Sequence, residues 1–244
     1  MIEKDKDGLA KVLSSVAKVF DRDVEKGQLT NGKIRLLMNI YTGSTDYTTL
    51  ADVDLVIEAV CEDIEVKKEV FKTLGKVVPN GVILASTTSS LNLDEIAEVS
   101  ERPQDVIGLH FFSPAHSMKL VEIVVPKAVS DTVIATGFEL AKKMAKVPVW
   151  AGNCDGFIGN RILLACVDAA AYMLLDGASP YEIDRAVRSF GCLMGPYQLL
   201  DLAGVDLGWR TRKRLSLNRD PNARYIDIAD RLCERCLLYT SDAA

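Results

Sequence analysis

The sequence has fewer basic than acidic residues and no apolar run long enough to span a bilayer. It also shows no apolar stretch of the kind that a secretory leader contains. Lysine and arginine number 29 against 34 aspartates and glutamates, and nucleic-acid-binding proteins normally carry a basic patch or stripe. The most apolar long segment, residues 161–175, is interrupted by Asp168 and is too short to span a bilayer. The charged residues 1–7 contain no apolar stretch of a secretory signal. We expect a soluble protein without a nucleic-acid partner or a membrane span, in a bacterial cytoplasm or an organellar matrix.

Cysteines are also few, with six scattered over 244 residues, which argues against a disulfide framework. Cys233 and Cys236 form a C-x-x-C pair, but no second pair and no neighbouring histidine accompany them. Because a structural zinc ion needs about four ligands, we expect no metal site. A reducing compartment is the simpler interpretation.

The first part of the chain alternates between apolar strands and helices. The predicted strands are residues 54–60, 81–86, 106–112, 120–125 and 147–150. The predicted helices around them are residues 8–28, a short helix through 36 and 37, 64–77, 93–99 and 132–145. Strands that are apolar on both faces and alternate with helices form a sheet covered on both sides. This pattern predicts an α/β nucleotide-binding domain.

After Asp155 and Gly156 every predicted element is a helix. Residues 158–175 carry small and apolar side chains on most faces, which predicts a central buried helix. Pro180 opens a second helix, and Gly195 with the proline after it opens a third. We place the domain boundary close to Cys154, with an all-helical domain after it.

Glu122 is the most informative single residue. It lies in the apolar run 120–125, and an unpaired buried carboxylate costs several kcal/mol, so it should be paired or protonated. The nearest candidate partner is His110, in the preceding strand. A carboxylate against one ring nitrogen fixes the tautomer and leaves the other nitrogen as a base. The alternative is a core histidine satisfied by a backbone carbonyl, but two polar residues in consecutive apolar strands favour an acid–base couple.

Polar residues also follow two other predicted strands. Residues 86–90, with the sequence STTSS, lie at the edge where ligands bind in parallel sheets, and the alternative is a turn that caps the next helix. Glu62 lies at the equivalent edge. Lys67 falls in the first turns of a charged helix, where a solvated lysine is the simpler interpretation. Asn160 begins the apolar helix after the boundary and would either cap it or face an interdomain cleft, whereas His116 is expected at the surface.

A set of short motifs keeps its order and spacing from about residue 8 to about residue 235. They are DLVIEAV at 54–60, STTSSL at 86–91, GLHFFSP at 108–114, MKLVE at 118–122, GFIGNR at 156–161, MGP at 194–196 and DLAG at 201–204. Through these motifs the chain resembles the 3-hydroxyacyl-CoA dehydrogenase family. Residues 113–116 and 206–209 are most similar to the dehydrogenase part of bifunctional enoyl-CoA hydratase/3-hydroxyacyl-CoA dehydrogenases of fatty-acid β-oxidation.

The resemblance implies oxidation of (S)-3-hydroxyacyl-CoA to 3-oxoacyl-CoA with NAD as cofactor and acyl-CoA as substrate, and we expect this chain to be an impaired fragment of such an enzyme. His110 would take the proton of the 3-hydroxyl as hydride passes to the nicotinamide, and Glu122 would orient His110. Ser89 and Asn160 would position the substrate oxygen and the imidazole. The helical domain would close on the acyl chain, and the implied partners are a second copy of the chain or a fused hydratase domain.

The resemblance also assigns cofactor contacts. Glu62 and Lys67 match positions that contact NAD, and Ser89 lies near the nicotinamide. Ser113 matches a position that contacts cofactor or substrate, where the family often has asparagine, as it also does at Thr87. The shorter side chain of Ser113 weakens that contact.

Both ends depart from the family pattern. The family begins with a strand, a G-x-G-x-x-G turn and a second strand, and no such turn occurs here. We therefore expect a truncated Rossmann-type domain over 1–154 that lacks its first strand-helix-strand unit and binds NAD poorly, because the pyrophosphate loses its backbone donors and helix dipole. The helical domain is expected over 155–235, and residues 236–244 are expected to be a foreign tail.

Two other functions compete with the dehydrogenase. The chain could be a non-catalytic acyl-CoA-binding or assembly module, although such a module has little reason to bury a charged couple. It could instead belong to the related β-hydroxyacid dehydrogenases that act on free acids, which rely on a lysine in the helical domain rather than on a His–Glu pair.

Overall fold

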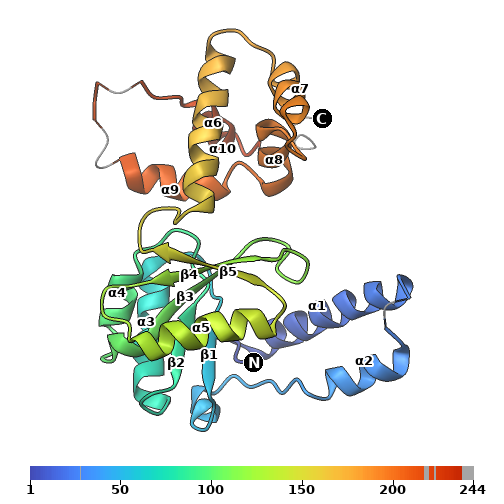
Figure 1. The fold of residues 1–244 in the computed structure, drawn as a ribbon, viewed down its shortest axis with the longest axis vertical. Coiled ribbons are helices and arrows are strands. Elements are labelled where there is room, and N and C mark those ends of the chain that lie inside the picture. Colours follow the sequence, from blue (N-terminus) through green and yellow to red (C-terminus); the bar gives the residue numbers. More distant parts are fainter. Residues whose placement is uncertain (28, 217–219, 223, 238–244) are drawn as a thin grey trace. The chain divides into compact units, whose positions relative to one another are not determined.

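The fold is described from a computed structural model, which places residues 1–27, 29–216, 220–222 and 224–237. The chain forms two units, Met1–Asn153 and Cys154–Ala244, and each is described by itself (Figure 1). The first unit is mixed α/β and the second is helical, so the predicted fold class is confirmed. The expected loss of a first strand-helix-strand unit stays a prediction.

A five-stranded sheet forms the centre of the first unit, with the strand order β1-β2-β3-β4-β5. Its strands are β1 (Leu55–Glu58), β2 (Ile83–Ser86), β3 (Val106–Phe111), β4 (Leu120–Val125) and β5 (Val147–Gly152). Neighbouring strands are parallel except β3 and β4, which are antiparallel. The carboxyl ends of β1, β2 and β3 therefore meet at one edge of the sheet, together with the amino end of β4.

The described residues of this unit form the α-helices α1 (Lys6–Glu25), α2 (Asn31–Met38), α3 (Ile64–Val77), α4 (Leu93–Glu98) and α5 (Asp131–Lys143). The same residues also form two short 3₁₀ helices, η1 (Tyr47–Leu50) and η2 (Pro103–Asp105). Helix α3 begins where the Asp63 side chain accepts hydrogen bonds from the amides of Glu65 and Val66, which satisfies donors that the first turn leaves unpaired.

The main hydrophobic core lies between α5 and one face of the sheet (Figure 1). Its buried members are Ala85, Ile107, Leu109, Val121, Ile123, Val133 and Ala141. Gly137 allows the close approach of α5, since a Cβ there would lie 3.0 Å from the Ile107 side chain. On the opposite face, Leu93 of α4 packs towards Gly108 of β3. The predicted cover on both faces is wrong for β5, where Val147 and Trp150 are exposed.

The helical unit contains α6 (Gly159–Leu175), α7 (Pro180–Phe190), α8 (Pro196–Ala203), α9 (Leu207–Ser216) and α10 (Ile228–Glu234). Asp184 of α7 caps α8, because its two carboxylate oxygens accept hydrogen bonds from the amides of Tyr197 and Gln198 at 2.9 and 3.0 Å. A Cβ on Gly195 would lie 2.2 Å from Asp184 Oδ1. The Gly-Pro start of α8 therefore follows from how closely α7 approaches it.

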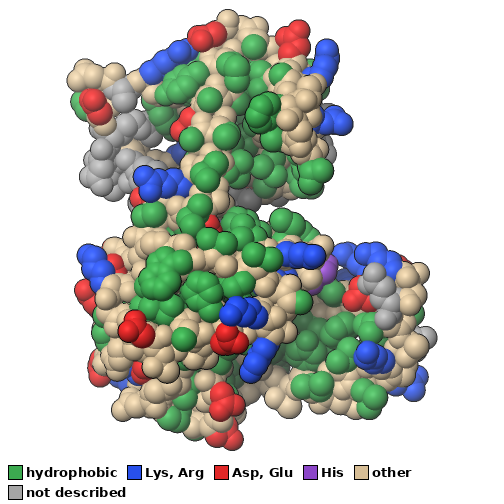
Figure 2. Space-filling model, in the orientation of Figure 1, with side chains coloured by type: hydrophobic (Ala, Val, Ile, Leu, Met, Phe, Trp, Pro, Cys, Tyr) green, Lys and Arg blue, Asp and Glu red, His purple; other side chains and the backbone are tan. Residues whose placement is uncertain are grey.

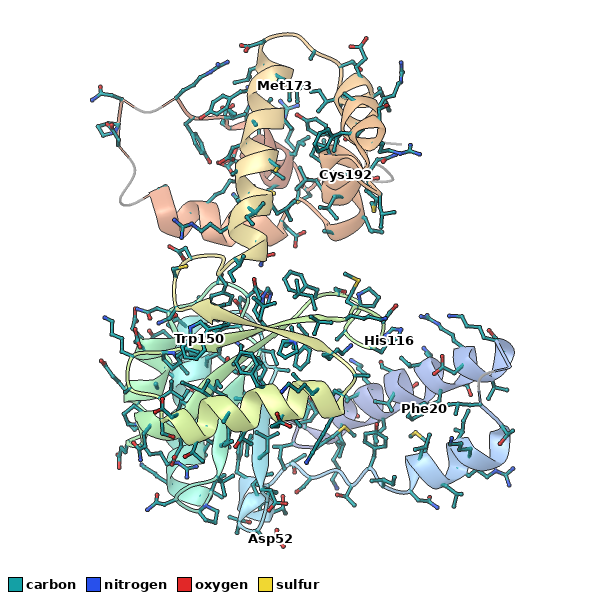
Figure 3. All side chains as sticks on the ribbon, in the orientation of Figure 1. Phe20, Asp52, His116, Trp150, Met173 and Cys192 are labelled. Atoms are coloured by element: carbon teal, nitrogen blue, oxygen red, sulfur yellow. The ribbon has the colours of Figure 1, made fainter. Side chains whose placement is uncertain are left out.

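The prediction that residues 158–175 form a buried helix is wrong. Every residue of α6 is described, and Ala170 alone among them is buried. Helices α7 and α8 contact α6, but they leave much of its apolar surface uncovered, including Ile162 and Met173, which is labelled in Figure 3. The apolar composition was correctly recognised, but the unit supplies too few neighbours to cover all sides of the helix.

All six cysteines are free. Within the described ranges, no cluster of three or more histidine, cysteine, aspartate or glutamate side chains is arranged to hold a metal ion. No helix in the same part of the chain has the length and apolarity needed to cross a membrane. The predicted foreign tail lies outside the described residues from 238 onward.

Candidate active site

His110 and Glu122 face each other across the antiparallel strands β3 and β4. The distance from His110 Nδ1 to Glu122 Oε2 is 2.6 Å, and the two residues are 3% and 1% exposed. Residues directly opposite each other in such strands have adjacent side chains, so the strand register brings the pair together. The structure thus contains the pairing that the sequence predicts.

This pairing determines which ring nitrogen can act as a base. When Nδ1 donates its proton to the Glu122 carboxylate, the lone pair of the neutral ring is on Nε2. The carboxylate can keep its hydrogen bond to Nδ1 when Nε2 gains a proton, because Nδ1 donates in both states of the ring. The Phe112 ring lies 4.7 Å from the imidazole between centroids. The couple is therefore suited to accept one proton at a fixed position.

The couple lies on the sheet face opposite α5. Side chains alternate between faces along a strand, and Leu109 and Ile123 point into the α5 core. His110 and Glu122 therefore point to the other side, the side on which Gly108 meets α4. A Cβ at Gly108 would lie 2.6 Å from the Val124 side chain, so a glycine is required beside the couple.

The residues after β2 form a loop held by Glu62. One oxygen of this carboxylate, Oε1, accepts hydrogen bonds from Thr88 Oγ1 at 2.7 Å, from the Ser89 amide at 2.8 Å and from the Ser90 amide at 3.1 Å. The alternative that residues 86–90 serve to cap α4 is wrong, because the capping residue is Asn92. Glu62 and Ser89 are therefore brought to the same edge, and Glu62 is the residue that shapes the loop.

Lys67 is buried, so the interpretation as a solvated surface lysine is wrong. Its ammonium lies 2.7 Å from Glu58 Oε1, 3.2 Å from the Val60 carbonyl oxygen and 3.7 Å from Glu62 Oε2. Glu58 was missed as a site residue, although it is the only acidic residue within the apolar run of β1. The same argument that singled out Glu122, a carboxylate in an apolar strand, would have found it.

The remaining predicted residues lie elsewhere. Ser113 is exposed and precedes Pro114 through a cis peptide bond at the end of β3. His116 is exposed in the β3–β4 loop, as expected (Figure 3). Asn160 is the second residue of α6, in the other unit, and is partly exposed. The first unit thus holds two groups of predicted residues, the His110–Glu122 pair on β3 and β4 and the Glu62, Lys67 and Ser89 group after β1 and β2.

The edge formed by Glu62 and residues 88–90 suits the sugar and amide end of a dinucleotide. The Glu62 side chain is 37% exposed, and a partly exposed carboxylate offers acceptors for ribose hydroxyls and an amide. The Lys67 ammonium is held within the protein by Glu58. The residues present therefore fit a nicotinamide ribose better than a phosphate.

Comparison with known proteins assigns the family. The family model described as "3-hydroxyacyl-CoA dehydrogenase, NAD binding domain" matches residues 1–154, and the model described as "3-hydroxyacyl-CoA dehydrogenase, C-terminal domain" matches residues 156–239. The chain belongs to the 3-hydroxyacyl-CoA dehydrogenase family. Since its N-terminal part matches the NAD-binding domain, NAD is its cofactor.

Relatives and solved structures agree with this assignment. The chain is 48% identical over 202 residues to the peroxisomal bifunctional enzyme of Cavia porcellus, an alignment that covers 78% of this chain and 28% of the relative. It is 39% identical over 249 residues to the peroxisomal bifunctional enzyme of Homo sapiens, covering 96% and 34%. The crystal structure of (S)-3-hydroxybutyryl-CoA dehydrogenase from Ralstonia eutropha matches with a TM-score of 0.92 at 31% identity, covering 99% of this chain and 87% of that one. The chain spans about a third or less of the length of these two curated relatives.

Proposed function

We propose that this chain oxidises (S)-3-hydroxyacyl-CoA to 3-oxoacyl-CoA with NAD, as a step of fatty-acid β-oxidation. The observation that carries the proposal is the buried His110–Glu122 couple at the carboxyl edge of the sheet. The relatives named peroxisomal, together with the bacterial fatty acid oxidation complex subunits, support a peroxisomal or bacterial cytoplasmic location.

His110 is the general base of the proposed reaction. Its Nε2 accepts the proton of the substrate 3-hydroxyl while the hydrogen on C3 leaves as hydride, so that C3 and its oxygen become a carbonyl. Glu122 holds the ring through Nδ1 and stabilises the imidazolium that forms. When bound, the nicotinamide supplies the hydride acceptor. In the reverse direction the imidazolium returns the proton to the carbonyl oxygen.

Two polar residues of the first unit complete the proposed site. Ser89, on the loop held by Glu62, positions the substrate oxygen near the base. Glu62 contributes its partly exposed carboxylate to the nicotinamide ribose. In the proposed reaction His110 accepts the proton, whereas these residues orient the reactants.

A stereochemical assay tests the function. With NAD and (S)-3-hydroxybutyryl-CoA we expect formation of NADH, followed by its absorbance, and no reaction with the (R) isomer. A base fixed by Glu122 can reach only one hydroxyl orientation, which is the physical reason for this selectivity. Acyl-CoA binding without turnover by either isomer would instead favour a non-catalytic acyl-CoA-binding module. Turnover of free 3-hydroxybutyrate in place of the thioester would contradict the proposed substrate class.

We also propose that the helical unit forms a homodimer through the turn between α7 and α8. Phe190 is 91% and Leu193 is 97% exposed there, and Figure 2 shows hydrophobic side chains gathered on this unit. Leu193 lines a groove that also contains Arg188 and Asp201. The proposal rests on the two exposed apolar side chains of Phe190 and Leu193, which a two-fold interface would bury.

The dimer is tested by the double substitution Phe190→Asp and Leu193→Asp. We expect the wild type to be a dimer in sedimentation-velocity experiments and the double variant to be a monomer, because four buried carboxylates across the interface are not compensated. Leu36→Asp, at an apolar position of α2 that is 69% exposed, is the control and should leave the dimer intact. A monomeric wild type would contradict the proposal and leave a fused hydratase domain as the expected partner.

A further inference from the structure

A closed ring of polar groups lies at the carboxyl ends of β1 and β2. Glu58 Oε1 binds the Lys67 ammonium, and Glu58 Oε2 accepts a hydrogen bond from Ser86 Oγ at 2.7 Å. Ser86 Oγ in turn accepts from the Thr88 amide at 3.3 Å, and Thr88 Oγ1 donates to Glu62. Glu62 Oε2 lies 3.7 Å from the Lys67 ammonium, which closes the ring.

The charges in this ring are not balanced pair by pair. Two carboxylates, Glu58 and Glu62, share the single ammonium of Lys67. Glu58 is the closer partner at 2.7 Å, and its side chain is 1% exposed, as is that of Lys67. Glu62 is a partner at 3.7 Å, beyond hydrogen-bonding distance. The ammonium is therefore held on the Glu58 side of the ring.

Glu62 uses the oxygen that faces away from Lys67 to hold the loop. Oε1 accepts from Thr88 and from the amides of Ser89 and Ser90. Hydrogen bonds from backbone amides to a carboxylate are charge-assisted and stronger than neutral ones. Any movement of the carboxylate towards Lys67 would draw Oε1 away from these donors, so the loop depends on where the ammonium lies.

We propose that Glu58 is a positioning residue, which fixes the 88–90 loop by holding the Lys67 ammonium away from Glu62. The inference rests on the proposed function in one respect only, namely that Ser89 on this loop orients the substrate. Glu58 itself is buried beneath the edge and acts through Lys67 and Glu62. Without the negative charge of Glu58, the buried ammonium turns to Glu62 as its remaining anionic partner, and the loop amides lose their acceptor.

The substitution Glu58→Gln tests this coupling, with backbone amide hydrogen exchange of Ser89 and Ser90 as the readout. Glutamine keeps the size of the side chain and removes its charge. We expect exchange of these two amides to accelerate at least about tenfold, because exchange reports local opening of the hydrogen bonds. Glu139→Gln is the matched control: Glu139 forms a surface ion pair with Lys142 at 2.9 Å on α5, and its loss should leave the loop unchanged.

A double variant separates positioning from a general loss of structure. Adding Lys67→Met to Glu58→Gln removes the ammonium that would otherwise attract Glu62, and replacing both members of a buried ion pair is often tolerated. We expect exchange at Ser89 and Ser90 to return to within about threefold of the wild type. A role limited to packing predicts instead that the double variant is at least as perturbed as the single one.

Two results would overturn the proposal. One is a folded Glu58→Gln variant whose Ser89 and Ser90 amides exchange as in the wild type. The other is a double variant in which exchange of these amides stays as fast as in Glu58→Gln. If Glu58→Gln does not fold, Glu62→Gln is tested in its place. This change removes the charge that holds the 88–90 loop, so the amides of Ser89 and Ser90 should exchange faster. Unchanged exchange of these amides in Glu62→Gln would contradict the proposal. Because exchange is measured without substrate or cofactor, an inactive wild type would overturn the proposed function and leave this test unaffected.

Discussion

Replacing His110 with glutamine is expected to lower kcat for (S)-3-hydroxybutyryl-CoA oxidation by about 10²–10⁴-fold, the range that a positioned general base contributes. The glutamine amide retains a donor towards Glu122, so the buried carboxylate keeps a hydrogen-bond partner and the fold should persist. The ring nitrogen that accepts the substrate proton is lost. Steady-state formation of NADH measures the effect, and circular dichroism of the same sample checks the fold.

Two further variants serve as comparisons for the loss of kcat in His110→Gln. Glu122→Gln should cost less, about 10–100-fold, because it leaves the imidazole in place and removes only the group that orients it. His116→Gln alters the other histidine of the chain, which is exposed, and should leave the rate unchanged. A His110→Gln variant within about threefold of the wild-type rate would exclude His110 as the base, since so small a loss is far below what a general base supplies.

Gly75→Ala is expected to lower the free energy of unfolding of the first unit by about 3 kcal/mol, the upper part of the range for overpacking. Gly75 lies on α3, and a Cβ there would sit 2.2 Å from the carbonyl oxygen of Ser100 and 2.9 Å from its carbonyl carbon. Because both atoms are backbone, no side-chain rotation relieves the overlap, and α3 must move away from the segment after α4.

Urea unfolding followed by tryptophan fluorescence measures this change. The chain has two tryptophans, Trp150 in the first unit and Trp209 in the second, so a Trp209→Phe background reports the first unit alone. Gly32→Ala is the control, because nothing lies within 4 Å of a Cβ at that helical position. Gly32→Ala should raise the free energy of unfolding by about 0.4–1 kcal/mol, because alanine lowers the conformational entropy of the unfolded chain. Equal free energies of unfolding for Gly75→Ala and the wild type would contradict the close approach of α3 to the backbone of Ser100.

The local elements and the His110–Glu122 couple could be predicted because each follows from short-range rules. The run at 120–125 is apolar on both faces, so its one carboxylate had to be paired, and the preceding strand offered one histidine. The segment 64–77 was recognised as a helix with its observed limits. In both cases the neighbouring residues in the sequence already contain the physical reason.

The burial of Lys67 and the exposure of α6 could not be predicted in this way. A lysine in the first turn of a charged helix becomes buried only because Glu58, at the end of another strand, lies 2.7 Å away, and helix periodicity carries no information about that distance. The apolar helix 159–175 is exposed because its cover depends on how many neighbours the unit supplies. Both features are tertiary, and hydrophobic pattern alone does not determine them.

The antiparallel register of β3 and β4 also protects the chain during folding. If the two strands paired one residue out of step, β4 would turn over and Glu122 would point into the apolar core under α5. There the carboxylate would meet Leu109 and Val133 instead of an imidazole, at a cost of several kcal/mol. The same carboxylate that we propose for catalysis therefore also penalises a shifted pairing of β3 and β4.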